Sequence, residues 1–307
     1  MKYVMYNFYT MTNKTYIITG PTASGKSGFA HELALRTNGC IINCDSVQIY
    51  RGIENISASP FAERLSDIEK QEIDGVPYKL FSILPLDEQI SVAQYLELAR
   101  NEYNNVLANG FTPIFVGGTG YYVNALVGGI SPMPDISNDA RMRARSLVAN
   151  DIENAKKLLP PEFTATDPQR VSRALEVFFE TGHHITEYQN APRVGAVIPN
   201  AVKILINPPL DELRTRISNR IPEMIRGGAH DEARQIIQNN WNPSRAIGAV
   251  QLVDFLRGKI SEQECISNWV NKTNQYAKRQ RTWFRGQFIA DIEIKHIPSK
   301  SDVLTVL

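Results

Sequence analysis

Short apolar runs alternate with amphipathic stretches along the first 120 residues of the chain. β-Branched and aromatic residues fill 15–19, 40–44 and 111–116, and each run stops at Gly or Asp, which is typical of buried strands. Helical periodicity follows over 26–37 and again over 92–107, and each of these stretches is closed by an Asn-Gly pair. Strands that alternate with helices predict an α/β fold with a parallel sheet and helices on both faces.

The pattern changes in the middle of the chain. Residues 124–199 contain helix-like stretches broken by proline pairs, and no strand is predicted there. A strand pattern returns at 202–206, and the rest of the chain is mostly helical, with a last strand expected at 292–297. This change of pattern predicts a helical insertion within one α/β domain.

We therefore predict two parts. Residues 1–122 and 200–307 form the α/β core, and residues 123–199 form the helical insertion. Residues 1–10 are aromatic-rich, have a single Lys and lack the pattern of a signal peptide. They are expected to be an extension, and Met11, just before the first strand, is an alternative start.

The composition is that of an ordinary globular protein. Hydrophobic residues make up 43% and charged residues 21%, which excludes disorder and fibrous repeats. The spacing of Cys40, Cys44 and Cys265 suits neither a disulfide framework nor a zinc site. No apolar stretch reaches the roughly 18 residues of a transmembrane helix. We expect a cytoplasmic protein without membrane contact.

Charge is unevenly distributed although the totals nearly balance. Residues 1–120 contain 9 Lys+Arg against 12 Asp+Glu, whereas residues 214–286 contain 13 against 6. A basic second half favours a polyanionic partner such as nucleic acid, and a merely solvated helix face is the alternative.

Residues 20–27 read Gly-Pro-Thr-Ala-Ser-Gly-Lys-Ser and match G-x-x-x-x-G-K-[ST] between a predicted strand and a predicted helix. Glycines let the backbone wrap a phosphate, Lys26 would neutralise it, and the Ser27 hydroxyl would complete a Mg²⁺ shell. The motif predicts a P-loop NTPase-like sheet and a nucleotide or diphosphate site, with ATP among the candidate ligands. Its residues are Gly20, Pro21, Thr22, Ala23, Ser24, Gly25, Lys26 and Ser27.

Two further segments follow predicted strands. Asp45 ends the second strand, where open α/β sheets place their ligands. It could take a proton from an attacking group, hold Mg²⁺ through water, or simply cap the next turn. Gly117-Gly-Thr-Gly120 forms a second glycine-rich turn, in which the Thr119 hydroxyl could reach a phosphate oxygen.

Taken in order, six segments of the chain resemble the motifs of the tRNA dimethylallyltransferase family, also called tRNA isopentenyltransferases or IPP transferases. Three of the six contain the P-loop, Asp45 and Thr119. The resemblance extends over about residues 15–290. The matching segments are 20–27, 45–52 (Asp-Ser-Val-Gln-Ile-Tyr-Arg-Gly), 116–121, 167–177 with Thr181-Gly182, 245–248 (Arg-Ala-Ile-Gly) and 275–285 (Gln-Tyr-Ala-Lys-Arg-Gln-Arg-Thr-Trp-Phe-Arg).

The resemblance implies an activity. A dimethylallyl group would pass from its diphosphate to N6 of the adenosine immediately 3′ of the anticodon (position 37), in tRNAs that read codons beginning with U. The product would be N6-dimethylallyladenosine. The P-loop would then hold dimethylallyl diphosphate instead of a nucleoside triphosphate, with Mg²⁺ as cofactor and the tRNA anticodon stem-loop as partner. We expect a monomer with no obligate protein partner.

The resemblance also implies roles for single residues. Asp45 would be the general base of a direct displacement, and Thr119 and Arg220 would stabilise the leaving diphosphate. Gln48, beside Asp45, would read the base edge. Asp45 and Thr119 would also contact tRNA, together with Ser46, Val47, Gln48, Arg141, Gln169, Arg170, Val171, Ser172, Arg173, Arg245, Gly248, Lys278, Arg279 and Arg281.

The chain departs from the family pattern in a few places. Tyr78-Lys79 stands where two histidines are common, and Ile56–Ser59 and Ala249 replace other usual residues. Pro222 is expected to interrupt the helix after Arg220. These changes fall in loop or tRNA-facing segments, so they concern tRNA affinity more than chemistry.

Three other kinds of protein would explain part of the sequence. A P-loop kinase of a small metabolite would use the loop and Asp45, but it has no need of the basic half. An adenine-nucleotide isopentenyltransferase would need neither the insertion nor the basic tail. A non-catalytic RNA-binding relative is the third, and the intact Lys26, Ser27, Asp45 and Thr119 argue against it.

Overall fold

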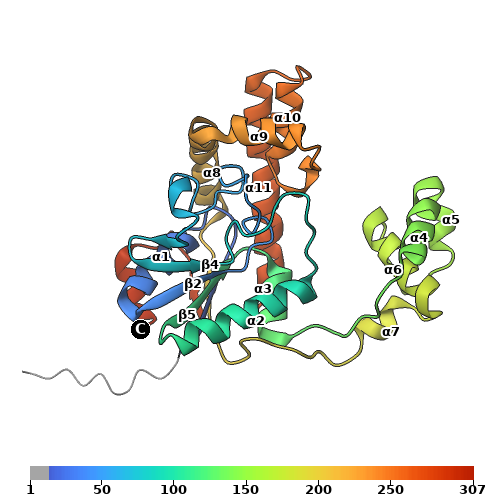
Figure 1. Cartoon of the computed structure of the whole chain (residues 1–307), viewed down its shortest axis with the longest axis horizontal. Coiled ribbons are helices and arrows are strands. Elements are labelled where there is room, and N and C mark those ends of the chain that lie inside the picture. The colour runs from blue at the N-terminus through green and yellow to red at the C-terminus, as the bar shows by residue number, and fades with distance from the viewer. Residues whose placement is uncertain (1–13) are drawn as a thin grey trace, which may run out of the picture. The chain divides into compact units, whose positions relative to one another are not determined.

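A computed structural model describes residues 14–307, which form two compact units (Figure 1). Unit 1 contains the described residues up to Val127 together with Val197–Leu307, and unit 2 contains Gly128–Ala196. The boundary expected at residue 123 falls inside a helix that belongs almost entirely to unit 1. The possible extension 1–10 and the alternative start Met11 lie outside the described residues.

Unit 1 is built on a seven-stranded sheet. Its strands are β1 (Tyr16–Thr19), β2 (Gly39–Asn43), β3 (Glu72–Ile73), β4 (Val76–Lys79), β5 (Thr112–Gly117), β6 (Val202–Ile206) and β7 (Ile292–Ile294). They lie in the order β3-β4-β2-β5-β1-β6-β7, and every neighbouring pair except β3–β4 is parallel. The predicted α/β fold with a mostly parallel sheet is therefore confirmed.

Two of the longest helices of unit 1 begin at clear capping signals. Ser91 and Ser261 each form a capping box, and Gly25 precedes the helix that was predicted over 26–37. The helices are α1 (Lys26–Thr37), α2 (Val92–Ala108), α3 (Gly120–Gly128), α8 (Leu210–Met224), α9 (His230–Gln238), α10 (Ala249–Leu256) and α11 (Glu262–Gln287).

Alternate residues of the central strands face two different helices. Ile18 and Val116 pack with Leu33 of α1 in one buried cluster. Phe115 has the opposite orientation, and its ring lies 6.3 Å from that of Tyr103 in α2. Because both faces of the sheet are covered, the strands appear in the sequence as continuous apolar runs.

Pro222 does not interrupt its helix, so that prediction is wrong. The α8 helix continues past it to Met224, because a proline removes only one backbone donor and its neighbours keep theirs. The irregularity comes afterwards, in a π-helical turn at Ile225–Ala229, where Gly228 has a φ of 120°. This turn redirects the chain into α9.

Unit 2 is a helical body with a core of its own. Its helices are α4 (Asn138–Asn150), α5 (Ile152–Lys156), α6 (Pro168–Thr181) and α7 (Ile185–Gln189). Ala144 of α4 and Ala174 of α6 are fully buried where these two helices pack. Asp167 caps α6, and Pro168 occupies the first helical position. No helix within residues 14–307 is long and apolar enough to cross a membrane.

Candidate functional site

The loops that follow β2 and β5 are hydrogen-bonded to each other at the carboxyl edge of the sheet, next to the P-loop that follows β1. The Cys44 amide donates to the Val116 carbonyl at 2.8 Å. The Ser46 amide donates to Thr119 Oγ1 at 3.0 Å, and the Thr119 hydroxyl donates to Ser46 Oγ at 3.1 Å. Parallel strands end at one edge, so the P-loop, Asp45 and Thr119 come together although they are far apart in sequence.

The loops that follow β1 and β2 line a cavity of about 660 Å³ in unit 1, whereas the predicted site residue Thr119 is bonded to the lining residue Ser46 and does not itself line the cavity. The P-loop, the segment 45–48 and the loop 55–60 form much of its wall. One face of α11 forms another part, through residues spaced three or four apart along the helix. These are Trp269, Thr273, Tyr276 and Gln280. The cavity is large enough for a ligand bigger than a lone phosphate.

The P-loop has the backbone that its sequence predicts. Gly25 has a φ of 88° just before α1, and a Cβ at Gly20 would lie 2.2 Å from the Ile206 carbonyl oxygen. The hydroxyl of Ser24 is buried without a hydrogen-bond partner. A bound phosphate oxygen would satisfy this hydroxyl, so the loop fits an anionic ligand. Ser27 is exposed in the first turn of α1.

Three basic side chains converge on the P-loop. Lys26 Nζ donates to the Pro21 carbonyl at 3.3 Å. Arg216 Nε donates to the Ala23 carbonyl at 2.9 Å, and Arg220 Nη2 donates to the Thr22 hydroxyl at 2.9 Å. The Nε of Arg220 is buried without a partner. Because their partners here are neutral oxygens, the three positive charges favour an anion in the cavity.

Burial and mutual repulsion alter the ionisation of these groups. Burial lowers the pKa of Lys26 to about 8, Asp45 opposes this effect, and Arg220 acts in the same direction as burial. Burial also lowers the pKa of Arg220 to about 10, and Arg216 adds to the effect. A bound diphosphate would favour the charged form of both side chains.

Asp45 caps the turn after β2, which is one of the roles that the sequence left open. Its Oδ1 accepts the Val47 amide at 3.0 Å, and its own amide donates to Asn43 Oδ1 at 2.8 Å. The side chain is half-buried and lines the cavity. Capping uses one carboxylate oxygen, so the other can still accept a proton. The capping and general-base roles are therefore compatible.

Gln48 is hydrogen-bonded to the loop 55–60, which forms part of the cavity wall. Its Nε2 donates to the carbonyls of Ser57 and Ala58, at 3.1 and 3.0 Å. Its amino group is thus bound within the protein, and any reading of a base edge would depend on Oε1. Orienting the loop 55–60 is a role that the sequence did not reveal.

Glu232 of α9 is hydrogen-bonded to the same loop. It was not singled out in the sequence. The buried carboxylate accepts the amide of Asn55 at 2.7 Å, the Asn55 Nδ2 at 2.9 Å and the amide of Ile56 at 2.8 Å. Burial raises the pKa of Glu232 to about 7 against the opposing effect of these bonds. Without Glu232, three donors at the base of the cavity wall would lose their acceptor.

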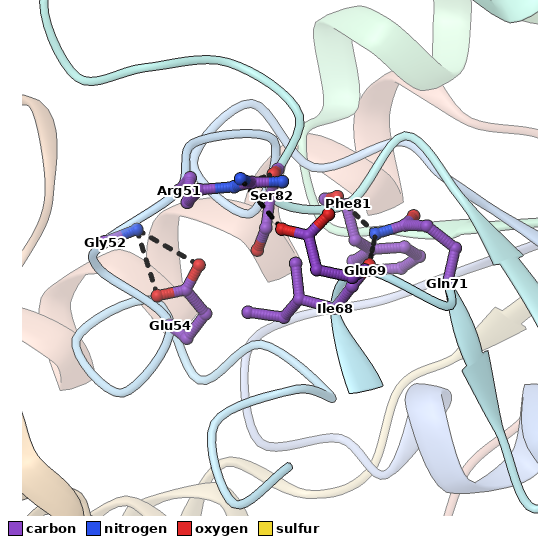
Figure 2. Close-up of polar contacts among 8 residues, drawn as sticks. All are labelled: Arg51, Gly52, Glu54, Ile68, Glu69, Gln71, Phe81 and Ser82. Carbon is purple, nitrogen blue, oxygen red and sulfur yellow. Dashed lines mark hydrogen bonds and ion pairs between the residues drawn. The ribbon is translucent and has the colours of Figure 1, made fainter. Parts of the chain in front are cut away.

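A separate group of contacts holds the chain on either side of β3 and β4 (Figure 2). Arg51 Nε donates to the Ser82 carbonyl at 3.1 Å, and Arg51 Nη1 pairs with Glu69 at 3.1 Å. The Glu54 carboxylate accepts the Gly52 amide at 3.1 and 3.0 Å. Arg51 belongs to a segment that resembles the family, yet it fixes this loop and does not line the cavity.

The predicted tRNA-binding residues of unit 1 have different surroundings. Lys278 and Arg279 are exposed on α11. Arg245 lines the cavity and donates to the Glu88 carbonyl at 3.2 Å. Arg281 is half-buried and donates to Asn207 Oδ1 at 3.0 Å. Gly248 has a φ of 101°, and a Cβ there would lie 2.2 Å from the ring of the buried Trp269, so its role is in packing.

The predicted tRNA-binding residues of unit 2 also differ in exposure. Arg141 and Gln169 are exposed. Arg170 and Arg173 pair with acidic residues three positions away along the chain, at 3.3 and 3.2 Å. Val171 is fully buried in the core of unit 2, so its side chain is not available to RNA. Ser172 is half-buried.

The fold and the site define a class of protein: an α/β P-loop protein with a carboxylate, Asp45, in the cavity that its P-loop lines. Similarity to known proteins agrees. The family described as IPP transferase matches residues 48–287, and the family described as isopentenyl transferase matches residues 13–76. The tRNA dimethylallyltransferase of Rickettsia bellii (strain OSU 85-389) is 37% identical over 304 residues, covering 94% of this chain and 93% of the relative. That of Zymomonas mobilis is 36% identical, covering 88% and 87%.

Solved structures show the same likeness. The full-length tRNA isopentenylpyrophosphate transferase of Bacillus halodurans matches with a TM-score of 0.67 at 30% identity, covering 96% of this chain and 94% of that one. A eukaryotic dimethylallyltransferase acting on tRNA matches with a TM-score of 0.67 at 25% identity, covering 89% and 70%. The chain belongs to the IPP transferase family, the tRNA dimethylallyltransferases. The resemblance drawn from the motifs and the predicted enzyme class are thereby confirmed.

Proposed function

We propose that the enzyme transfers a dimethylallyl group from dimethylallyl diphosphate to N6 of adenosine 37 in tRNAs that read codons beginning with U. The product is N6-dimethylallyladenosine. The observation that carries the proposal is that Asp45 and the basic P-loop line the same cavity. A weak amine nucleophile and a diphosphate leaving group need this pairing of a base with a cradle for anions.

The P-loop binds the diphosphate of the donor. Its backbone amides and the Ser24 hydroxyl bind phosphate oxygens, and Lys26 and Arg220 supply positive charge. Thr119 is bonded to Ser46, which lines the cavity, and its hydroxyl is the proposed further contact to the same diphosphate. A diphosphate fits the loop with or without an attached nucleoside, so no ATP is required.

Transfer proceeds by direct displacement. N6 of adenine forms a bond to the allylic C1 while the bond from C1 to the diphosphate oxygen breaks, and the leaving diphosphate takes that electron pair. The proton released from N6 passes to the Asp45 carboxylate. The amine is a poor nucleophile because its lone pair is delocalised into the ring, so removal of this proton matters. Lys26 and Arg220 stabilise the charge that develops on the diphosphate.

Mg²⁺ is the proposed cofactor, and the donor set suits it. Within residues 14–307, no group of three or more His, Cys, Asp or Glu side chains could hold a metal ion. Mg²⁺ binds through few protein ligands and substrate phosphates, so the exposed Ser27 hydroxyl is a sufficient protein ligand. When bound, the ion would neutralise charge on the leaving diphosphate.

The tRNA reaches the cavity through its anticodon loop. The target adenine leaves its stack, which requires a few kcal/mol and least in a single-stranded loop. Lys278 and Arg279 of unit 1 and Arg141 of unit 2 are exposed cations suited to backbone phosphates. Arg245 lines the cavity and is placed to contact the nucleotide that enters it.

The test is transfer with the purified protein. Mg²⁺, dimethylallyl diphosphate and tRNA lacking the modification are combined, and the digested nucleosides are identified by mass spectrometry. N6-Dimethylallyladenosine should appear, and Asp45→Asn should lower the single-turnover rate by about 10²–10⁴-fold. The asparagine keeps the acceptor for Val47, so the turn survives.

Parallel reactions address the two rival enzymes. AMP or ADP in place of tRNA tests an adenine-nucleotide isopentenyltransferase, and ATP with small acceptors tests a kinase. Modification of free nucleotides but not of tRNA would contradict the proposal.

A further inference from the structure

Gln280 bridges the two loops that surround the phosphate site. It lies on the cavity face of α11 and is only 7% exposed. Its Oε1 accepts the Thr22 amide of the P-loop at 2.8 Å, and its Nε2 donates to the Gly118 carbonyl at 2.8 Å. One side chain therefore connects segments that are 258 and 162 residues away from it in sequence.

The space around this bridge is closely filled. A Cβ on Gly118 would lie 2.6 Å from Gln280 Nε2 and 3.3 Å from the Gly20 carbonyl oxygen. The same point is 3.6 Å from Lys26 Nζ. The absence of a side chain at Gly118 is what lets the amide of Gln280 reach both loops beside the P-loop lysine.

Both partners of Gln280 adjoin groups that we assign to the diphosphate. The Thr22 hydroxyl also accepts a hydrogen bond from Arg220 Nη2, at 2.9 Å. Gly118 directly precedes Thr119, which is bonded to Ser46. The Gln280 amide thus links the loop that holds Arg220 to the loop that carries Thr119.

We propose that Gln280 is a positioning residue that holds the P-loop and the loop 117–120 at the separation required to bind the donor diphosphate. The proposal rests on the proposed function for the identity of that ligand. Gln280 does not touch the reacting atoms. It acts through Thr22, Arg220 and Thr119, and the cradle is preorganised before the donor arrives.

A positioning role of Gln280 can be distinguished from a role in folding, because other contacts hold α11 in place. Trp269 and Phe284 of α11 are each 1% exposed, and Arg281 is bonded to Asn207. A Cβ on Gly120 would lie 2.4 Å from the Trp283 ring, so this ring packs directly on α3. Removing the two Gln280 bonds should leave the helix in place.

The experiment compares two substitutions with a control on the same helix. Gln280→Met keeps the length of the side chain and removes both bonds. Gln280→Glu keeps the acceptor for Thr22 but places an oxygen against the Gly118 carbonyl. Gln263→Ala is the control, because Gln263 is exposed near the start of α11. Binding of inorganic diphosphate with Mg²⁺ is measured by calorimetry, and KM is measured for dimethylallyl diphosphate and for tRNA.

We expect Gln280→Met to raise the Kd for diphosphate and the KM for dimethylallyl diphosphate about tenfold, with the KM for tRNA changed less than about twofold. Gln280→Glu should lose more affinity than Gln280→Met, because it adds a repelled carboxylate near the anion. The control should match the unaltered protein. A residue needed only for folding would not raise the KM for dimethylallyl diphosphate while leaving the KM for tRNA nearly unchanged.

A folded Gln280→Met protein that binds diphosphate with unchanged Kd would overturn the proposal. So would an equal rise in both KM values. If the Met variant does not fold, Gln280→Glu decides through the same Kd. Binding of inorganic diphosphate needs no transfer, so an inactive but diphosphate-binding wild-type protein would contradict only the proposed function.

Discussion

The P-loop lysine illustrates how a single residue is adjusted by its surroundings. Burial holds the pKa of Lys26 at about 8 in the free protein, well below the 10.5 that is ordinary for a lysine. At about pH 9 most Lys26 side chains are therefore neutral. A bound diphosphate favours the ammonium form and raises this pKa again. Binding should accordingly require a proton in alkaline solution.

We expect dimethylallyl diphosphate to bind with uptake of up to about one proton at pH 9, and with little uptake below about pH 7, where Lys26 is already charged. Affinity should fall as the pH rises through about 8. Calorimetric titrations in buffers of different ionisation enthalpy measure the uptake directly. Lys26→Arg, which stays charged throughout, should abolish it. Buffer-independent heats at pH 9 in the unaltered protein would contradict this account.

The strands and helices of unit 1 were largely predictable because each is encoded locally. The helix over 26–37 and the strand over 202–206 occur with the expected bounds. The β3–β4 hairpin was not predicted, since β3 has only two residues and Pro77 lies in β4. Edge strands this short leave no alternating pattern to detect.

The site was predictable where its residues follow a strand and not where they come from distant helices. The P-loop and Asp45 could be placed because the ends of parallel strands meet at one edge. Glu232 and Gln280 could not, because their partners lie 177 and 258 residues away in sequence. An isolated Glu or Gln on an amphipathic helix carries no local sign of such a partner.

The packing of the start of α10 against α11 depends on a glycine. Gly248→Ala should destabilise the protein by about 3 kcal/mol or more, because a positive φ is combined with overlap of the buried Trp269 ring. Gly258→Ala is a matched control. It also has a positive φ, 71°, but nothing lies within 4 Å of the added Cβ, so about 1 kcal/mol is expected. Urea unfolding measures both, and equal losses would show that the ring contact is unimportant.

The attachment of α9 to the cavity wall depends on Glu232. Glu232→Ala should lower the free energy of unfolding by about 3 kcal/mol, because it leaves the amides of Asn55 and Ile56 and the Asn55 side chain without their buried acceptor. Asp231→Ala, at the exposed neighbouring position, should change it by less than about 1 kcal/mol. Similar unfolding midpoints in urea for the two variants would refute this.

At the scale of the whole molecule, the backbone phosphates of the RNA are expected to bind exposed cations that the donor does not touch. Arg141→Ala in unit 2 should weaken tRNA binding at low salt and reduce the slope of log K against log[salt] by about 0.7–0.9. Binding of dimethylallyl diphosphate should not change. Fluorescence titrations at several salt concentrations measure the slope.

Arg36→Ala provides the comparison, because Arg36 lies in the last turn of α1, at the opposite edge of the sheet, and pairs with Glu32 at 2.7 Å. An unchanged slope in Arg141→Ala would remove Arg141 from the RNA interface.

The chain leaves unit 1 and returns to it at a single place. Val197 and Ile198 both donate to the Leu126 carbonyl, at 2.9 and 3.0 Å, and Ile130 pairs with Val194 just inside unit 2. Unit 2, residues 128–196, is therefore inserted between two backbone segments of unit 1, around Leu126 and Val197, that are hydrogen-bonded to each other. Excising or exchanging residues 128–196 would accordingly require joining only two backbone segments that already lie side by side, and would remove no strand of the sheet and no residue that lines the cavity.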